Sequence, residues 1–226
     1  VVALSQSPAV AYVEPTYFYE LAETQPDDPL VERKVLWNLE RVNARRAWAR
    51  VTDSKAIVAV VDTGVDYRHE DLAGNMWVNP AEIAGNGIDD DRNGFLDDVH
   101  GIDLADGDGD PMDQSSTSHG THVAGTIAAI GNNRKGGAGI VWHAPIMGLR
   151  IFGAQNLPAT QDRIAMAIDY AVERGARVIN ASWGGPSDSR ALREAIARAG
   201  DKGVIVVAAA GNQGHDIDRM KSYPAV

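Results

Sequence analysis

Residues 55–66 read KAIVAVVDTGVD, an apolar run that ends at an aspartate, Asp62, and a glycine-containing turn. A short apolar run bounded by a turn is typical of a buried β-strand. Three later runs have the same character and are further strand candidates: 144–152, 176–183 and 203–211. Amphipathic stretches separate these runs and predict helices over 119–130, 160–174 and 188–199. Alternating strands and helices predict a doubly wound α/β fold with a mostly parallel sheet.

Capping residues and glycines indicate where the helices begin and end. Thr160 and Ser187 are the expected N-caps of the second and third helices, because short polar side chains satisfy the first free N–H groups. Glycines mark the expected helix ends, at Gly175, Gly200 and Gly203. A further helix-like pattern covers 29–48, between a polar linker and the first strand.

Polar and glycine-rich residues follow three of the predicted strands. They are Asp62, the SWGG run at 182–185, and Gly211 with Asn212. Ligands of parallel α/β sheets bind beyond the carboxyl ends of the strands, so we expect these residues at one edge. His119 opens the helix in SHGTHVAGT (118–126) and can reach the same edge. An aspartate and a histidine placed in this way are two members of a serine protease triad.

The composition predicts one globular domain with an uneven charge. The 226 residues are 44% hydrophobic and carry a formal net charge of -10 at pH 7, which argues against nucleic acid as a partner. The longest apolar run, 203–211, is too short to cross a membrane, so we expect no membrane association. The chain has no cysteine, so disulfides give no indication of its compartment.

Four motifs in order resemble those of the subtilisin-like serine proteases, over nearly the whole chain from about Asp28 to Ala225. VAVVDTGVDYRHEDL (58–72) resembles the aspartate motif of that family, and HGTHVAGTIAA (119–129) resembles its histidine motif. NASWGG (180–185) resembles the substrate-binding strand, and VVAAAGNQG (206–214) resembles the oxyanion-hole segment. The resemblance implies the fold of this family and an endopeptidase activity.

The resemblance also assigns roles to residues. Asp62 would orient His119, His119 would act as the general base, and the side-chain amide of Asn212 would stabilise the oxyanion. Three residues would present backbone groups to an extended substrate, which binds by strand addition: Ser182, Trp183 and Gly184. Small residues would keep the backbone accessible around a specificity pocket: Gly184, Gly185, Ala210 and Gly211.

Other interpretations fit these residues less well. A single DTG turn, or a glycine-flanked histidine at a helix start, can be purely structural, but this does not account for four motifs in order. His119 and His122 could be paired zinc ligands, yet no HExxH motif accompanies them. The first strand is not followed by GxGxxG, and no GxxxxGK precedes a helix, which disfavours a nucleotide site.

Residues 89–113 hold most of the negative charge, with ten aspartates and a single arginine. The overlapping stretch GNGIDDDRNGFLDDV (85–99) resembles the first half of an EF-hand calcium loop, with hard oxygen ligands at alternate positions and a glycine at the turn. The expected ligands are Asp89, Asp91, Asn93, Phe95 and Asp98. His100 occupies the twelfth position, where such loops have glutamate, so Asp98 is expected to substitute. A solvated acidic loop is the alternative.

The resemblance points to a second calcium site, formed by Asp71 and the loop near Asn132 and Asn133. The amino-terminal region offers no clear counterpart of the glutamine ligand that this site has in the family. The run DGDGDP at 106–111 either completes the first site or holds another ion.

Residues 1–27 resemble the end of an inhibitory propeptide and a linker, before a catalytic portion at 28–226. SPAVAYVEPTYFYEL (7–21) has strand-like alternation, and TQPDDP (24–29) is a polar linker. We expect cleavage in or near 19–29; an ordinary edge strand is the alternative for 7–21. A tethered propeptide implies export, so the resemblance implies a secreted protein with its own propeptide and protein or peptide substrates as partners.

The 226 residues contain no GTSMA-like motif for the nucleophilic serine. Ser182 belongs to the binding strand, and Ser222 precedes YPA at 223–225. We therefore expect this polypeptide to be inactive alone and its sheet to be incomplete at the carboxyl-terminal end. Three hypotheses explain the missing serine. The chain is a portion of a normal protease, or a pseudoprotease or calcium-dependent peptide-binding module, or one chain of a split enzyme. The first is favoured because the chain ends within a motif.

Overall fold

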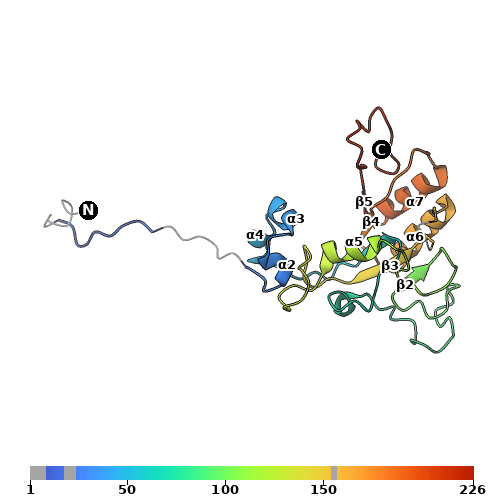
Figure 1. Cartoon of the computed structure of the whole chain (residues 1–226), viewed down its shortest axis with the longest axis horizontal. Coiled ribbons are helices and arrows are strands. Elements are labelled where there is room, and N and C mark those ends of the chain that lie inside the picture. Colours follow the sequence, from blue (N-terminus) through green and yellow to red (C-terminus); the bar gives the residue numbers. More distant parts are fainter. Residues whose placement is uncertain (1–8, 18–23, 154–156) are drawn as a thin grey trace.

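The computed structural model describes residues 9–17, 24–153 and 157–226 (Figure 1). Its centre is a five-stranded sheet in the order β2-β3-β1-β4-β5, and every pairing between these strands is parallel. The strands are β1 (Val58–Asp62), β2 (Gly101–Asp103), β3 (Ile146–Arg150), β4 (Val178–Ala181) and β5 (Ile205–Ala208). The predicted α/β fold is confirmed, and β2 is an addition that the sequence pattern did not indicate.

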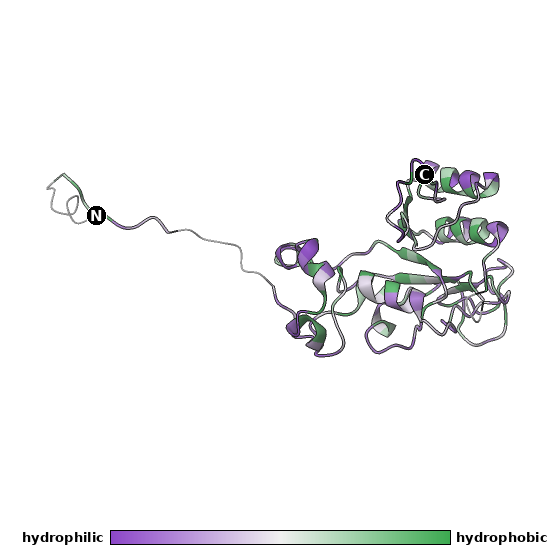
Figure 2. Ribbon diagram, turned by 45° about the horizontal axis from the view of Figure 1, so that its top comes forward, coloured by the Kyte–Doolittle hydropathy of each residue, from purple (hydrophilic) through white to green (hydrophobic). Residues whose placement is uncertain are grey.

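Helices cover both faces of the sheet. They are α5 (His119–Ala128), α6 (Gln161–Glu173) and α7 (Arg190–Asp201), of which α6 and α7 lie side by side (Figure 1). On β1, Ala59 and Val61 pack in the hydrophobic core that contains residues of α6 and α7, whereas Val60 packs in the core that contains residues of α5. The strand is therefore buried on both sides, which explains its continuous apolar sequence. Figure 2 shows that hydrophobic residues are concentrated in the central strands and on one side of the helices.

Two of the predicted helix boundaries are wrong. Ser187 is not the N-cap of α7; Ser189 is, and its hydroxyl accepts a hydrogen bond from the Leu192 N–H at 3.3 Å. Gly200 lies inside α7 because the helix continues to Asp201, ahead of Gly203 with φ +74°. Thr160 is at the N-cap position of α6 as expected, but its side chain makes no capping hydrogen bond. The expected end of α6 before Gly175 is confirmed.

Three short helices precede β1: α2 (Pro29–Glu32), α3 (Trp37–Arg41) and α4 (Ala44–Trp48). Together with Ala138 and Trp142 from the segment before β3 they form a small separate core, in which the ring centres of Trp48 and Trp142 lie 5.2 Å apart. Residues 9–17 contain neither helix nor strand, and the remainder of the predicted propeptide strand lies outside the described residues. No helix in the described part of the chain is both long and apolar enough to span a membrane.

Candidate active site

Asp62 and His119 meet at the carboxyl end of β1. Asp62 Oδ1 lies 2.7 Å from Nδ1 of the His119 ring. The Asp62 side chain is almost completely buried, whereas 49% of the His119 side chain is exposed. Within the described residues nothing hydrogen-bonds to the second ring nitrogen, Nε2. This geometry fixes one imidazole tautomer and leaves Nε2 available to exchange a proton.

Burial dominates the electrostatics of Asp62. Desolvation raises the pKa of this carboxyl, and hydrogen bonds from His119 and the Thr63 N–H oppose part of that increase. The nearby charge of Asp113 raises the pKa of Asp62 further. Asp62 Oδ2 is buried and has no hydrogen-bond partner among the described residues. A positive imidazolium at His119 would therefore be the main compensation for the Asp62 charge.

Residues outside α5 hold its first turn in place. The preceding residue, Ser118, makes no side-chain capping bond. Instead, the Gly120 N–H donates to Thr63 Oγ1 at 2.9 Å, and the Thr121 N–H donates to Asp113 Oδ2 at 3.1 Å. Thr63 directly follows Asp62, so its contact fixes the beginning of the helix, and with it His119, against the end of β1.

The segment after β4 is anchored to the centre of the sheet. Trp183 donates its indole N–H to the Val61 carbonyl at 2.8 Å, and Ser182 Oγ accepts from the Asn180 amide at 2.9 Å. Gly185 exchanges two backbone hydrogen bonds with Tyr223, at 3.0 and 2.8 Å. The backbone of Gly185 is thus already paired within the chain. A substrate peptide would therefore have to pair with the backbone groups of the preceding residues, Ser182 to Gly184.

Four of the predicted substrate-binding residues line one pocket of about 420 Å³: Gly184, Gly185, Ala210 and Gly211. Gln213 and Ser222 also line it. Asn212 is on the same segment and is exposed, and its side-chain amide makes no hydrogen bond within the described residues. The two segments that follow β4 and β5 therefore form a recess that could hold a side chain.

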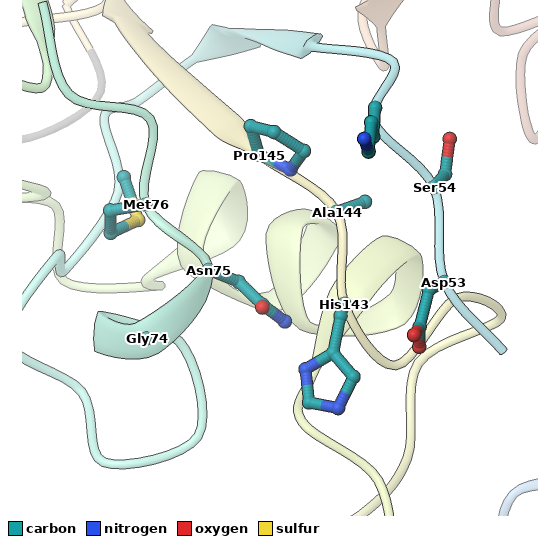
Figure 3. A pocket seen from close by; sticks show the side chains of 9 residues that line it. Asp53, Ser54, Gly74, Asn75, Met76, His143, Ala144 and Pro145 are labelled. Carbon is teal, nitrogen blue, oxygen red and sulfur yellow. The ribbon is translucent and has the colours of Figure 1, made fainter.

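A different pocket, of about 380 Å³, lies near the amino ends of β1 and β3 (Figure 3). Its lining includes Asp53, Asn75 and His143. Since Asp62 ends β1, this pocket lies toward the opposite edge of the sheet from the Asp62 and His119 pair. It contains none of the predicted site residues.

Glu82, Asp91 and Asp98 form an acidic cluster, which offers three carboxylate oxygens within 4.8 Å of one another. Glu82 Oε2 and Asp91 Oδ1 are buried, and no residue in the described part of the chain hydrogen-bonds to them. Desolvation raises the pKa of Glu82, and the charges of Asp98 and Asp91 add to this increase. Orphaned oxygens in a concentrated negative field fit a hard cation such as calcium.

The predicted EF-hand ligands divide between this cluster and its surroundings. Asp91 and Asp98 belong to the cluster, whereas Asp89 accepts the N–H groups of Asn93 and Gly94 at 3.0 and 2.8 Å. The side-chain N–H of Asn93 donates to the Asp98 carboxylate at 2.7 Å, so Asn93 contacts the cluster through a donor group. Phe95 packs its ring edge-on against Tyr170. The sequence pattern missed Glu82, which lies outside the loop.

A second group surrounds Asp71, which is buried and accepts the Asn133 amide at 2.8 Å and the Gly137 N–H at 3.2 Å. Asp28, also buried, accepts the N–H groups of Asn132 and Asn133 at 2.6 and 3.2 Å. Burial is the main cause of the raised pKa of Asp28. Asp28 was not among the predicted ligands, although it comes from the amino-terminal region and its charge lies near that of Asp71.

The run DGDGDP does not join the acidic cluster. Asp106 Oδ2 lies 2.6 Å from Nη1 of the buried Arg150, and the same nitrogen donates to Asp103. Burial raises the pKa of Asp103 despite this pairing. Both carboxylates are thus paired with the buried Arg150.

The fold and the site define a class: an α/β protein with an Asp–His pair at the carboxyl end of a parallel sheet, beside a glycine-lined pocket. Residues 53–226 match the subtilase family model. The chain belongs to the subtilase family.

Two relatives and one solved structure place the chain within this family. It is 37% identical over 213 residues to the thermophilic serine proteinase of Bacillus sp. (strain AK1), covering 94% of this chain and 46% of the relative. It is 39% identical over 188 residues to the major intracellular serine protease of Bacillus subtilis (strain 168), covering 81% and 52%. Fervidolysin from Fervidobacterium pennivorans, a keratinolytic enzyme related to subtilisin, superposes with a TM-score of 0.66 at 32% identity, covering 88% of this chain and 27% of fervidolysin. The chain thus spans about half the length of these two relatives.

Proposed function

We propose that this chain is part of a serine endopeptidase, in which Asp62 and His119 activate a serine from outside the 226 residues. The observation that carries the proposal is the 2.7 Å contact between the buried Asp62 carboxylate and the half-exposed His119 ring. His119 Nε2 would take the serine proton and return it to the leaving amine, while Asp62 stabilises the imidazolium. The Asn212 amide would donate to the oxyanion.

The residues at the same edge of the sheet support protein or peptide substrates. An extended peptide would pair with the backbone at 182–184, and one side chain would enter the pocket of about 420 Å³ between the segments after β4 and β5. Backbone pairing recognises any extended peptide, so the pocket would contribute the selectivity.

Labelling with a fluorophosphonate probe tests this proposal. The 226-residue chain alone should not react, and a product extended along its coding sequence to a GTSMA-like serine should react. His119→Ala in the extended product should remove the labelling, because the serine loses its base. His122→Ala is the matched control and should leave the labelling intact.

The other hypotheses give different results in this experiment. A pseudoprotease or peptide-binding module would have a stop codon after Val226 and would bind peptides without reacting. A split enzyme would co-purify with a second chain that carries the reactive serine. Labelling that persists in the His119→Ala variant would contradict the proposed role of the Asp62 and His119 pair.

We also propose that calcium binds the protein at two places. The acidic cluster would provide three carboxylates, and the group around Asp71 would provide two, with Asn and backbone oxygens of the loop 131–137. The support is the pair of orphaned oxygens in the cluster and the burial of Asp28 beside Asp71. Bound calcium would neutralise these charges and stabilise the fold by mass action.

Thermal unfolding in EDTA and in excess calcium tests this proposal. Calcium should raise the unfolding temperature by several degrees, since occupancy at 100 times the dissociation constant contributes about 2.7 kcal/mol. Glu82→Gln should reduce the increase because it removes a ligand of the cluster. Asp162→Asn, outside both groups, is the control and should keep the full increase. An equal unfolding temperature in both conditions would rule out the calcium sites.

Finally, we propose that residues 1–27 are the end of a propeptide and that the mature protein is extracellular. The support is the resemblance of 7–21 to a propeptide end. One relative is named an intracellular protease, so the compartment needs a direct test. N-terminal sequencing of the protein from the culture medium should give a first residue within 19–29. A protein confined to the cells that still carries residues 1–18 would contradict this proposal.

A further inference from the structure

The acidic cluster of Glu82, Asp91 and Asp98 has a cation of its own. Arg174 Nη2 lies 2.9 Å from Asp91 Oδ2. Among the residues that the structure describes, no other lysine or arginine pairs with any of these three carboxylates. Arg174 fits this position only in part, because its Nε is buried and finds no hydrogen-bond partner in residues 9–17, 24–153 and 157–226.

The arginine also leaves the cluster incompletely satisfied. Within the part of the chain that the structure describes, Glu82 Oε2 and Asp91 Oδ1 remain without hydrogen-bond partners, although only 8% of the Asp91 side chain is exposed. A guanidinium binds through N–H groups at its edge, whereas a metal ion can contact several oxygens at once from a point between them. A divalent cation would therefore satisfy oxygens that Arg174 does not reach.

Arg174 has favourable contacts apart from the ion pair with Asp91. It is the C-cap residue of α6, where the helix dipole favours a positive charge. Its guanidinium carbon lies 5.4 Å from the centre of the Tyr170 ring, within cation–π range. Tyr170 lies one turn earlier on α6 and donates its hydroxyl to Asp98 Oδ2 at 2.5 Å. An arginine that leaves Asp91 can therefore remain over this ring.

We propose that Arg174 is a displaceable counter-cation of the acidic cluster. It pairs with Asp91 in the ion-free protein, and calcium binds by replacing it there. This inference rests on the calcium binding proposed above and does not depend on peptide hydrolysis. Arg174 then stabilises the ion-free fold, weakens calcium binding, and sets the calcium concentration at which the cluster fills.

The variant Arg174→Gln tests the inference, by calorimetric titration with calcium and by thermal unfolding. It should bind calcium at the cluster about tenfold more tightly than the unchanged protein, a difference of about 1.4 kcal/mol. It should unfold at a lower temperature in EDTA, and the difference should close in saturating calcium. The double variant Glu82→Gln with Arg174→Gln should lose the tighter binding, which assigns that binding to the cluster.

Arg198→Gln is the matched control. It removes an exposed ion pair, 2.6 Å from Arg198 Nη2 to Asp169 Oδ2 on α6, that lies outside the acidic cluster. It should leave the calcium affinity unchanged. If Arg174→Gln binds calcium with unchanged or weaker affinity, the proposed displacement of Arg174 is overturned, whereas the proposal of calcium binding stands. If neither the unchanged protein nor Arg174→Gln binds calcium, both proposals fail.

A measurement on the unchanged protein avoids any dependence on how the variants fold. In a ¹⁵N spectrum of the arginine side chains, the Arg174 Nε–H signal should shift as calcium is added. The Arg198 signal should stay in place. An Arg174 signal that does not move in the calcium-saturated protein overturns the inference.

Discussion

At the scale of single residues, the raised pKa of the buried Asp62 carboxyl makes the stability of the fold depend on pH. Desolvation raises this pKa above the usual 3.8, so the folded protein retains a proton at pH values where the unfolded chain has released it. The free energy of unfolding therefore falls as pH rises from about 4 through the raised pKa. We expect Asp62→Asn to have a flatter dependence in that range, measured by urea unfolding between pH 4 and 7.

Asp162 provides the contrasting control. Hydrogen bonds from Thr160 and the backbone lower its pKa, so its contribution to stability is lost only as pH falls below about 4. Asp162→Asn should therefore leave the dependence between pH 4 and 7 unchanged. If Asp62→Asn keeps the full slope of the unchanged protein, the raised pKa of Asp62 is not a source of that dependence.

Individual site residues were predictable where the sequence keeps a local motif. Asp62 and His119 are 57 positions apart, yet each lies in a recognisable string, and the structure brings them together. Asp28 contacts residues 104 and 105 positions away, and no local pattern marks it. Glu82 lies outside the alternating EF-hand spacing and enters the cluster only through the folding of its loop.

At the element scale, the position of α5 depends on the close approach of its second residue to the turn after β1. A Cβ added to Gly120 would collide with the Gly64 carbonyl oxygen and lie 3.0 Å from Asp62 Cβ. Gly120→Ala should therefore destabilise the fold by roughly 1–3 kcal/mol, since neither neighbour is a flexible chain end. Chemical denaturation measures this loss.

Gly125 is the matched control on the same helix, because a Cβ there would meet nothing within 4 Å. Gly125→Ala should stabilise the fold by about 1 kcal/mol, the difference in helix propensity between glycine and alanine. If both variants lose the same stability, the close packing of Gly120 against the turn is not what positions α5.

Helices and strands were predictable from the sequence where they are long enough to show a hydrophobic pattern. The four apolar runs became strands within a few residues of the expected limits. For β1 and β3 the reason is burial on both faces, which requires continuous apolar sequence. β2 has only three residues, Gly101–Asp103, inside an acidic segment that reads as a loop. Its pairing with β3 depends on Gly101, whose missing side chain allows close approach to the Gly148 carbonyl. A periodicity argument cannot detect that contact.

At the scale of the whole molecule, the sheet has an unprotected edge strand. β5 pairs with β4 on one side, and Ile205 and Val207 are 62% and 50% exposed. A strand with free backbone groups and exposed apolar side chains is prone to pair with other chains. The predicted incomplete sheet is consistent with this arrangement. We therefore expect the isolated 226-residue chain to associate as its concentration rises.

Analytical ultracentrifugation of charged variants tests this expectation. Ile205→Lys should shift the isolated chain toward the monomer, because a lysine on an edge strand opposes pairing with a second edge. Ile83→Lys is the matched control, since Ile83 is 65% exposed but lies in a loop outside the sheet, and it should leave the association unchanged. If both variants change the association equally, general surface hydrophobicity causes it rather than the β5 edge. A monomer at all concentrations would show that the edge is protected.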